Sequence, residues 1–229
     1  MSSVLAGGSI DKVVRFYDST IGKKVVMAVT GLILFGFLVA HMLGNLQLFI
    51  SMEQMNHYAE TLHGNPALLW TARSVLIVSV ILHMWAWIQL AAVKKAARPI
   101  AYVKPSNVQA SLGSRTMALS GPIIAIFVIY HLLHMTTGTL HPKFVELHAY
   151  ENLVNAFKVL PVAVIYVVGM LLIGSHLSHG IWSMFQSIGF SHPRYTPMIK
   201  KFAAIFSWLL IAGFIAVPVS IVLGIVKLP

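Results

Sequence analysis

The strongest constraint on this chain is a run of apolar residues, Tyr166–Phe185, which is long enough to cross a lipid bilayer and yet contains two histidines. A membrane-spanning helix needs about 20 mainly apolar residues. This run reads YVVGMLLIGSHLSHGIWSMF, with His176 and His179 well inside it. A polar ring at that depth costs several kcal/mol unless it has a partner. Both histidines must therefore be held by something.

Four further apolar runs predict an all-α integral membrane protein. Hydrophobic residues make up 58% of the chain and charged residues 10%, against about 25% charged in an ordinary soluble domain. We expect one transmembrane domain over residues 1–229, a bundle of five helices. The helices are expected over about residues 25–49, 67–93, 117–138, 159–188 and 202–226. The apolar run nearest the N-terminus, which starts near Val25, is too long for a cleaved signal peptide, so its helix is expected to be retained.

Charge and cysteine content narrow the functional classes. The net charge of +10 could suggest a nucleic-acid partner, but basic residues of membrane proteins gather on cytoplasmic loops, so none is expected. The N-terminal segment and the loops between helices 2 and 3 and between helices 4 and 5 hold 12 of the 16 Lys and Arg. This count predicts a cytoplasmic N-terminus and an outside C-terminus. The absence of cysteine excludes disulfides and iron–sulfur clusters within this chain.

Four of the expected helices carry a histidine at membrane depth. We obtain the depth of each from its position in the helix and a rise of about 1.5 Å per residue. His41 and His131 share a layer near the outer face, and His83 and His176 share a layer near the inner face. The two layers lie about 15 Å apart along the membrane normal. Four unrelated structural histidines would have no reason to sort into two pairs.

Paired imidazoles on facing helices suit the axial ligation of a haem iron, whose apolar macrocycle fills the gap between helices. Two such ligands saturate the iron, which favours electron transfer over oxygen chemistry. We therefore expect haems between helices 1–4. A zinc site would need further N, O or S ligands. Alternatively, a buried histidine can bond a neighbouring carbonyl or belong to a proton path.

Other polar residues are secondary candidates. His134 and His179 each follow a proposed ligand by one turn and are expected to contact a haem propionate or a quinone. Arg73 could pair with a propionate or snorkel to the interface. Small residues beside the ligands, expected to leave room for a ring, are Gly44, Gly174, Ser175 and Gly180. Histidines between the runs, expected to be solvated, are His57, His63, His141, His148 and His192.

Four stretches of the chain resemble the five-helix dihaem cytochrome b subunit of succinate:quinone oxidoreductases and quinol:fumarate reductases. They are KKVVMAVTGLILFGFLVAHMLGN with His41, SVLIVSVILHMW with His83, SGPIIAIFVIYHLLH with His131, and the run with His176. The last is the most specific, through its H-x-S-x-G-[ILV]-W-S ending. The resemblance extends from about Arg15 to Val226.

The resemblance implies a respiratory complex II subunit, of the cytochrome b558 kind, in a bacterial or archaeal cytoplasmic membrane. It implies two haems b, an outer pair at His41 and His131 and an inner pair at His83 and His176, and a quinone, commonly menaquinone. The implied partners are a flavoprotein with covalently bound FAD and an iron–sulfur subunit, and the complex could form a higher oligomer. This chain alone would not oxidise succinate but would contribute the quinone site.

The implied quinone site lies on the outer side, where Glu53, Asn56 and His57 could supply hydrogen bonds or a proton, or could be ordinary polar loop residues. Some fumarate-reducing members of the family carry a glutamate in the helix that corresponds to Tyr166–Phe185. This run contains no acid, which favours succinate oxidation. Basic segments, Lys94–Arg115 and Arg194–Lys201, are expected to help dock the partners. Alternatives are a dihaem cytochrome b of a hydrogenase or formate dehydrogenase, or a non-redox proton-coupled transporter.

Overall fold

The described part of the chain is entirely helical. The computed structural model describes residues 3–97, 100 and 110–229, and no strand occurs among them. Its elements in chain order are α1 Ser3–Asp18, α2 Thr20–Asn45, the 3-10 turn η1 Leu46–Phe49, α3 Met52–His63, α4 Pro66–Ala96, α5 Leu112–His131, the π-helical turn η2 Leu132–Thr136, α6 Ala149–Phe157, α7 Leu160–Ser187 and α8 Thr196–Val222. Arg98 and Lys104 of the expected docking segment lie outside the described residues.

Within the described residues, five helical segments are long and apolar enough to span a membrane, as the sequence predicted. They are Thr20–Phe49, Pro66–Ala96, Gly113–Thr136, Leu160–Ser187 and Thr196–Val222. The boundaries differ from the predicted ones by a few residues. The last helix starts earlier than expected because Pro197 occupies its first turn, a position that suits proline, which has no N–H to satisfy there.

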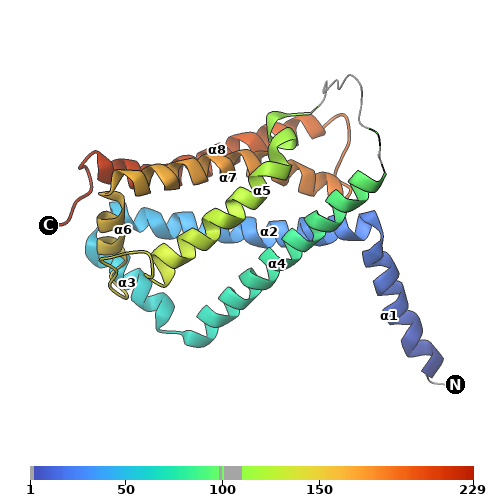
Figure 1. Cartoon of the computed structure of the whole chain (residues 1–229), viewed down its shortest axis with the longest axis horizontal. Coiled ribbons are helices and arrows are strands. Elements are labelled where there is room, and N and C mark those ends of the chain that lie inside the picture. The colour runs from blue at the N-terminus through green and yellow to red at the C-terminus, as the bar shows by residue number, and fades with distance from the viewer. Residues whose placement is uncertain (1–2, 98–99, 101–109) are drawn as a thin grey trace.

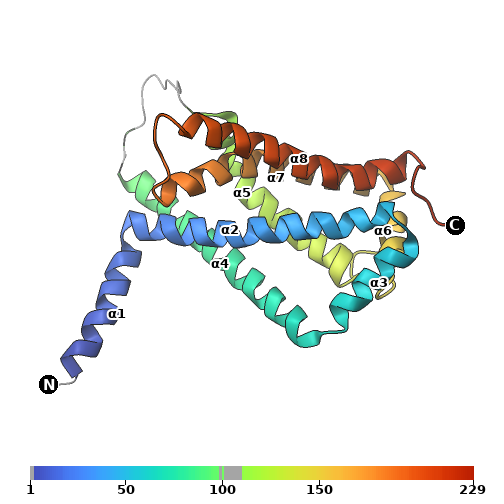
Figure 2. The same cartoon turned by 180° about the vertical axis from the view of Figure 1, so that it is seen from behind.

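The spanning helices pack unevenly (Figures 1 and 2). α7 and α8 run side by side, α2 packs against α4 and α7, and α5 crosses α7. The buried core lies mainly on α6, α7 and α8, where Val154, Phe157 and Ile211 are almost fully enclosed. α4 instead exposes large apolar side chains, including Ile81 and Trp85. A bilayer would cover this apolar surface.

The bundle has two distinct ends. At the basic end, α2, α5 and α8 begin, and α4 and α7 end (Figure 1). At the opposite cap end, the short helices α3 and α6 lie across the bundle. We therefore call the predicted inner layer of histidines the basic-side layer, and the predicted outer layer the cap-side layer.

The two cap helices were not predicted, since both segments read as polar loops. Ser51 caps α3 by accepting a hydrogen bond from the backbone N–H of Gln54 at 3.0 Å. α6 buries Tyr150, Leu153 and Phe157, which recur at the three- and four-residue spacing of one helical face. That spacing was visible in the sequence.

The corner between α1 and α2 is tightly built at the basic end. The buried Lys23 donates from Nζ to the carbonyl oxygens of Tyr17 and Asp18, at 3.2 and 2.6 Å. A Cβ atom on Gly22 would lie 2.0 Å from the carbonyl oxygen of Phe16, so no larger residue fits without movement. These contacts satisfy carbonyls at the end of α1 that would otherwise be left unpaired.

Candidate functional site

The structure brings the two histidines of the cap-side layer together. His41 of α2 and His131, the last residue of α5, have ring centroids 5.8 Å apart. Phe37 stacks on the His41 ring at 5.3 Å, and Phe214 of α8 lies 5.7 Å from it. We call His41 and His131 the cap-side pair.

The basic-side layer holds the second pair. His83 of α4 and His176 of α7 have ring centroids 6.5 Å apart. Gly31 of α2 lets the His83 ring pass close by, since a Cβ there would lie 3.4 Å from its Cε1. We call His83 and His176 the basic-side pair. Both pairings agree with the layers predicted from helical rise.

Three of the four rings have a hydroxyl partner at Nδ1. The distances are 3.1 Å from His83 to Thr30 Oγ1, 3.4 Å from His176 to Ser120 Oγ and 3.3 Å from His131 to the Tyr166 hydroxyl. An imidazole engaged at Nδ1 keeps Nε2 for a ligand, and metal-bound histidines are usually oriented in this way. None of the three hydroxyl residues was predicted from the sequence, because nothing in their spacing marks them.

The separation within each pair fits a metal ion placed between two imidazole nitrogens. Metal–imidazole bonds are about 2 Å long and each ring centroid lies roughly 1 Å beyond its nitrogen, so the centroids should be about 6 Å apart. The two pairs measure 5.8 and 6.5 Å. The described residues form no group of three or more His, Cys, Asp or Glu that could hold a metal ion. Two ligands suffice only where a macrocycle supplies the others, as in haem.

The glycines beside the ligands divide into two kinds. No heavy atom lies within 4 Å of a Cβ built on Gly180, one turn after His176, and the same holds for Gly36 on α2. Gly180 therefore has open space beside it, whereas Gly36 is itself exposed and lies at the outer surface of the bundle. The prediction was wrong for Gly44 and Gly174. A Cβ on Gly44 would meet the Tyr58 ring at 2.9 Å, and one on Gly174 would meet Ile211 and Trp208 at 3.0 Å, so both serve close packing instead.

His134 belongs to a buried polar cluster next to the cap-side pair. Its Nδ1 lies 2.9 Å from the Tyr166 hydroxyl, and its ring stacks on His141 with centroids 4.9 Å apart. His141 was expected to be solvated, but only 5% of it is exposed, and its Nε2 lies 2.9 Å from the carbonyl oxygen of Asn152. Folding of the segment before α6 over the bundle buries this histidine.

His179 lies near the basic end of α7. Its Nδ1 is buried and has no hydrogen-bond partner among the described residues. Trp182 meets the His179 ring edge-on at 5.4 Å, and Lys200 Nζ lies 4.5 Å from the centre of the Trp182 ring. The ring of His179 thus contacts Trp182, whereas the ring of His176 faces His83.

Arg73 lies on the cap-side half of α4. Its guanidinium carbon is 5.2 Å from the centre of the Trp70 ring, and 61% of Trp70 is exposed. A cation over an exposed tryptophan is the arrangement expected at a membrane interface. This contact favours the interfacial alternative for Arg73.

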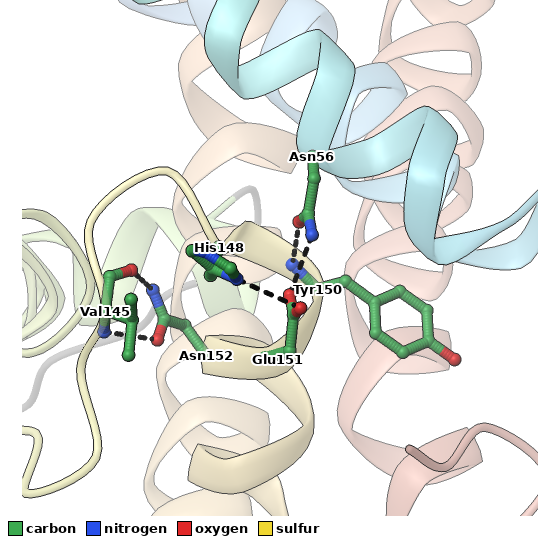
Figure 3. Close-up of polar contacts among 6 residues, drawn as sticks. All are labelled: Asn56, Val145, His148, Tyr150, Glu151 and Asn152. Carbon is green, nitrogen blue, oxygen red and sulfur yellow. Dashed lines mark hydrogen bonds and ion pairs between the residues drawn. The ribbon is translucent and has the colours of Figure 1, made fainter. Parts of the chain in front are cut away.

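The residues proposed for the quinone lie on α3, where Asn56 is fully engaged (Figure 3). Its Oδ1 accepts from the backbone N–H of Tyr150 at 2.9 Å, and its Nδ2 donates to Glu151 Oε2 at 2.8 Å. Asn56 thereby ties α3 to α6. Glu53 and His57 are exposed, and His57 Nδ1 lies 3.8 Å from Glu60.

Glu151 is a polar residue of the cap that the sequence did not single out. Its Oε1 lies 3.1 Å from His148 Nδ1, and Asn56 holds the other oxygen (Figure 3). Burial raises the pKa of this carboxyl, but the hydrogen bonds from Asn56 and His148 outweigh it and hold the pKa below its ordinary value. The carboxylate is therefore charged at neutral pH and locks the cap.

The site thus consists of two imidazole pairs in separate layers, with a hydrogen-bonded cap at one end of the bundle. No protein-family model, no curated protein and no solved structure matches this chain.

Proposed function

We propose that this chain is the membrane-anchor and electron-transfer subunit of a succinate dehydrogenase that reduces a quinone. One observation supports this above all: histidines from facing membrane helices meet in two pairs, with centroids 5.8 and 6.5 Å apart. Each pair would hold one haem b through its two imidazoles. When bound, the haems would supply one-electron carriers across the bilayer.

The residues of the chain would bind and orient these groups. Thr30 donates its hydroxyl proton to the carbonyl of Val26 at 2.7 Å, so it accepts from Nδ1–H of His83 and leaves Nε2 for iron. Ser120 and Tyr166 are placed to do the same for His176 and His131. The apolar walls of the helices would exclude water, which favours fast electron transfer without oxygen chemistry.

The proposed orientation follows the charge count. The basic end would face the cytoplasm, where Lys94, Lys200 and Lys201 can dock an iron–sulfur subunit that carries electrons from a flavoprotein. The basic-side pair lies nearer to that partner than the cap-side pair. Electrons would leave at the cap end to a menaquinone, and Glu53 and His57 are among the exposed polar groups there.

The decisive experiment purifies the complex from membranes and measures haem per chain and the reduced-minus-oxidised spectrum. We expect two low-spin b haems, together with a flavoprotein and an iron–sulfur protein. His83→Ala should remove one haem, whereas His192→Ala, a substitution in the exposed α7–α8 loop, should retain both. A haem-free protein with all four histidines intact would contradict the proposal. A hydrogenase or formate dehydrogenase as the co-purified partner would replace the succinate assignment.

A further inference from the structure

Tyr166 of α7 occupies an unusual position between two histidines. Its hydroxyl oxygen lies 3.3 Å from Nδ1 of His131 and 2.9 Å from Nδ1 of His134. The side chain is 5% exposed, so water has little access to the hydroxyl. The three side chains form a continuous hydrogen-bonded chain from the cap-side pair towards the cap.

The Tyr166 ring is fixed by aromatic neighbours. Phe127 meets it edge-on at 5.3 Å and Phe157 of α6 at 4.9 Å. Gly169, one turn along α7, makes room for Phe127, because a Cβ there would lie 2.7 Å from that ring. Edge-to-face contacts of this kind restrict ring movement. The fixed ring therefore holds the hydroxyl between His131 and His134.

The hydrogen bonds from His131 through Tyr166 to His134 run in one direction. A tyrosine hydroxyl has one proton to donate, so only one of the two Nδ1 atoms can accept it and the other must carry its own proton. If His131 binds iron through Nε2, its Nδ1 carries the proton and donates to the Tyr166 oxygen. Tyr166 then donates to Nδ1 of His134, which keeps its proton on Nε2.

We propose that Tyr166 is a positioning residue for the cap-side haem ligand His131, and that His134 strengthens its effect by accepting a hydrogen bond from the Tyr166 hydroxyl. This inference rests on the proposed function, since it concerns how a haem would be tuned. The basic-side pair differs, because the hydroxyl of Thr30 is directed to a backbone carbonyl rather than to a second histidine.

The hydrogen-bonded chain of His131, Tyr166 and His134, which we call the relay, has a definite consequence for the redox potential of the cap-side haem. An acceptor at Nδ1–H makes the imidazole a stronger electron donor, which stabilises ferric over ferrous iron. Loss of the Tyr166 hydroxyl would leave a buried N–H without its acceptor and weaken that donation. The midpoint potential of the cap-side haem should therefore rise, while that of the basic-side haem should not change.

The test compares Tyr166→Phe with Tyr130→Phe in the purified complex. Tyr130 stacks on His134 at 5.4 Å, so its variant removes a hydroxyl nearby but keeps the relay. We expect two haems in each variant and a rise of the cap-side potential in Tyr166→Phe alone. A tenfold change in the ferric-to-ferrous preference would be about 59 mV. Thr30→Val should shift only the basic-side haem, and the loss of one haem in His41→Ala assigns the signals.

Unchanged potentials in Tyr166→Phe, or equal shifts of both haems, would overturn the relay. If Tyr166→Phe loses the cap-side haem, His134→Leu decides instead, because it removes only the final acceptor. A smaller rise confined to the cap-side haem then supports the relay, and no rise overturns it. Absence of haem from the unaltered protein would defeat the proposed function itself, which separates the two failures.

Discussion

At the scale of single residues, buried histidines are distinguished by the partners of their ring nitrogens. His176 has a hydroxyl at Nδ1 and faces His83, whereas His179, one turn further on, has a buried Nδ1 without a partner. From the sequence, His176 was the expected ligand, and His179 was expected to contact a haem propionate or a quinone. The structure brings only His176 to the ring of His83.

This difference predicts unequal effects of two similar substitutions. His176→Ala should remove about half of the haem, because the basic-side pair would keep only one of the two histidines that would hold its haem. His179→Ala should keep both haems, with changes limited to the spectrum or potential of the basic-side one. Haem quantification by pyridine haemochrome measures both variants. Loss of haem in His179→Ala with retention in His176→Ala would reverse the assignment of the ligand.

At the scale of elements, the cap depends on a charged hydrogen-bond network between α3 and α6. A carboxyl whose pKa is lower in the folded than in the unfolded protein stabilises the fold above its ordinary pKa, and this contribution is lost as pH falls through the folded-state pKa. Glu151 is such a group, because Asn56 and His148 hold its pKa down despite burial. The cap should therefore loosen in acid.

We expect the thermal midpoint of the protein to fall as pH drops through the range in which Glu151 protonates. Glu151→Gln should remove that part of the pH dependence, and Asn56→Ala should cost about 1.5–3 kcal/mol, the usual range for a lost hydrogen bond to a charged group. Glu146→Gln is the matched control, since Glu146 is an exposed acid in the same loop region. Melting curves over a pH series give the measurement. If the thermal midpoint of Glu151→Gln still falls at low pH as it does in the unaltered protein, another group causes the fall.

The elements also show what the sequence could and could not predict. Long apolar runs are a strong signal, so the five spanning helices were found with small errors at their ends. Constant helical rise then paired His41 with His131 and His83 with His176. Which helix neighbours a glycine depends on tertiary packing, so Gly44 and Gly174 were misjudged. Short amphipathic helices such as α3 were missed because polar residues dominate them.

At the scale of the whole molecule, charge and hydrophobicity are arranged along one axis. The long apolar helices run between a basic end and a cap end, and α1 leaves the bundle at the basic end (Figure 2). Tyr17 of α1 donates to Gln89 Oε1 on α4 at 2.9 Å, which fixes the direction in which α1 departs. Exposed Val13 and Val14 on this helix suit the membrane interface. The partner-docking surface and the start of electron transfer would then lie at the same end.

The orientation can be tested directly because the chain contains no cysteine. Ser191→Cys places a single thiol at the basic end and Glu146→Cys places one in the cap region, both at exposed positions. With a membrane-impermeant maleimide, we expect Glu146→Cys to be labelled in intact cells and Ser191→Cys only in inverted vesicles. The opposite labelling would put the basic end outside. Cytoplasmic subunits could then no longer dock next to the basic-side pair, and electrons would have to enter through the cap-side pair.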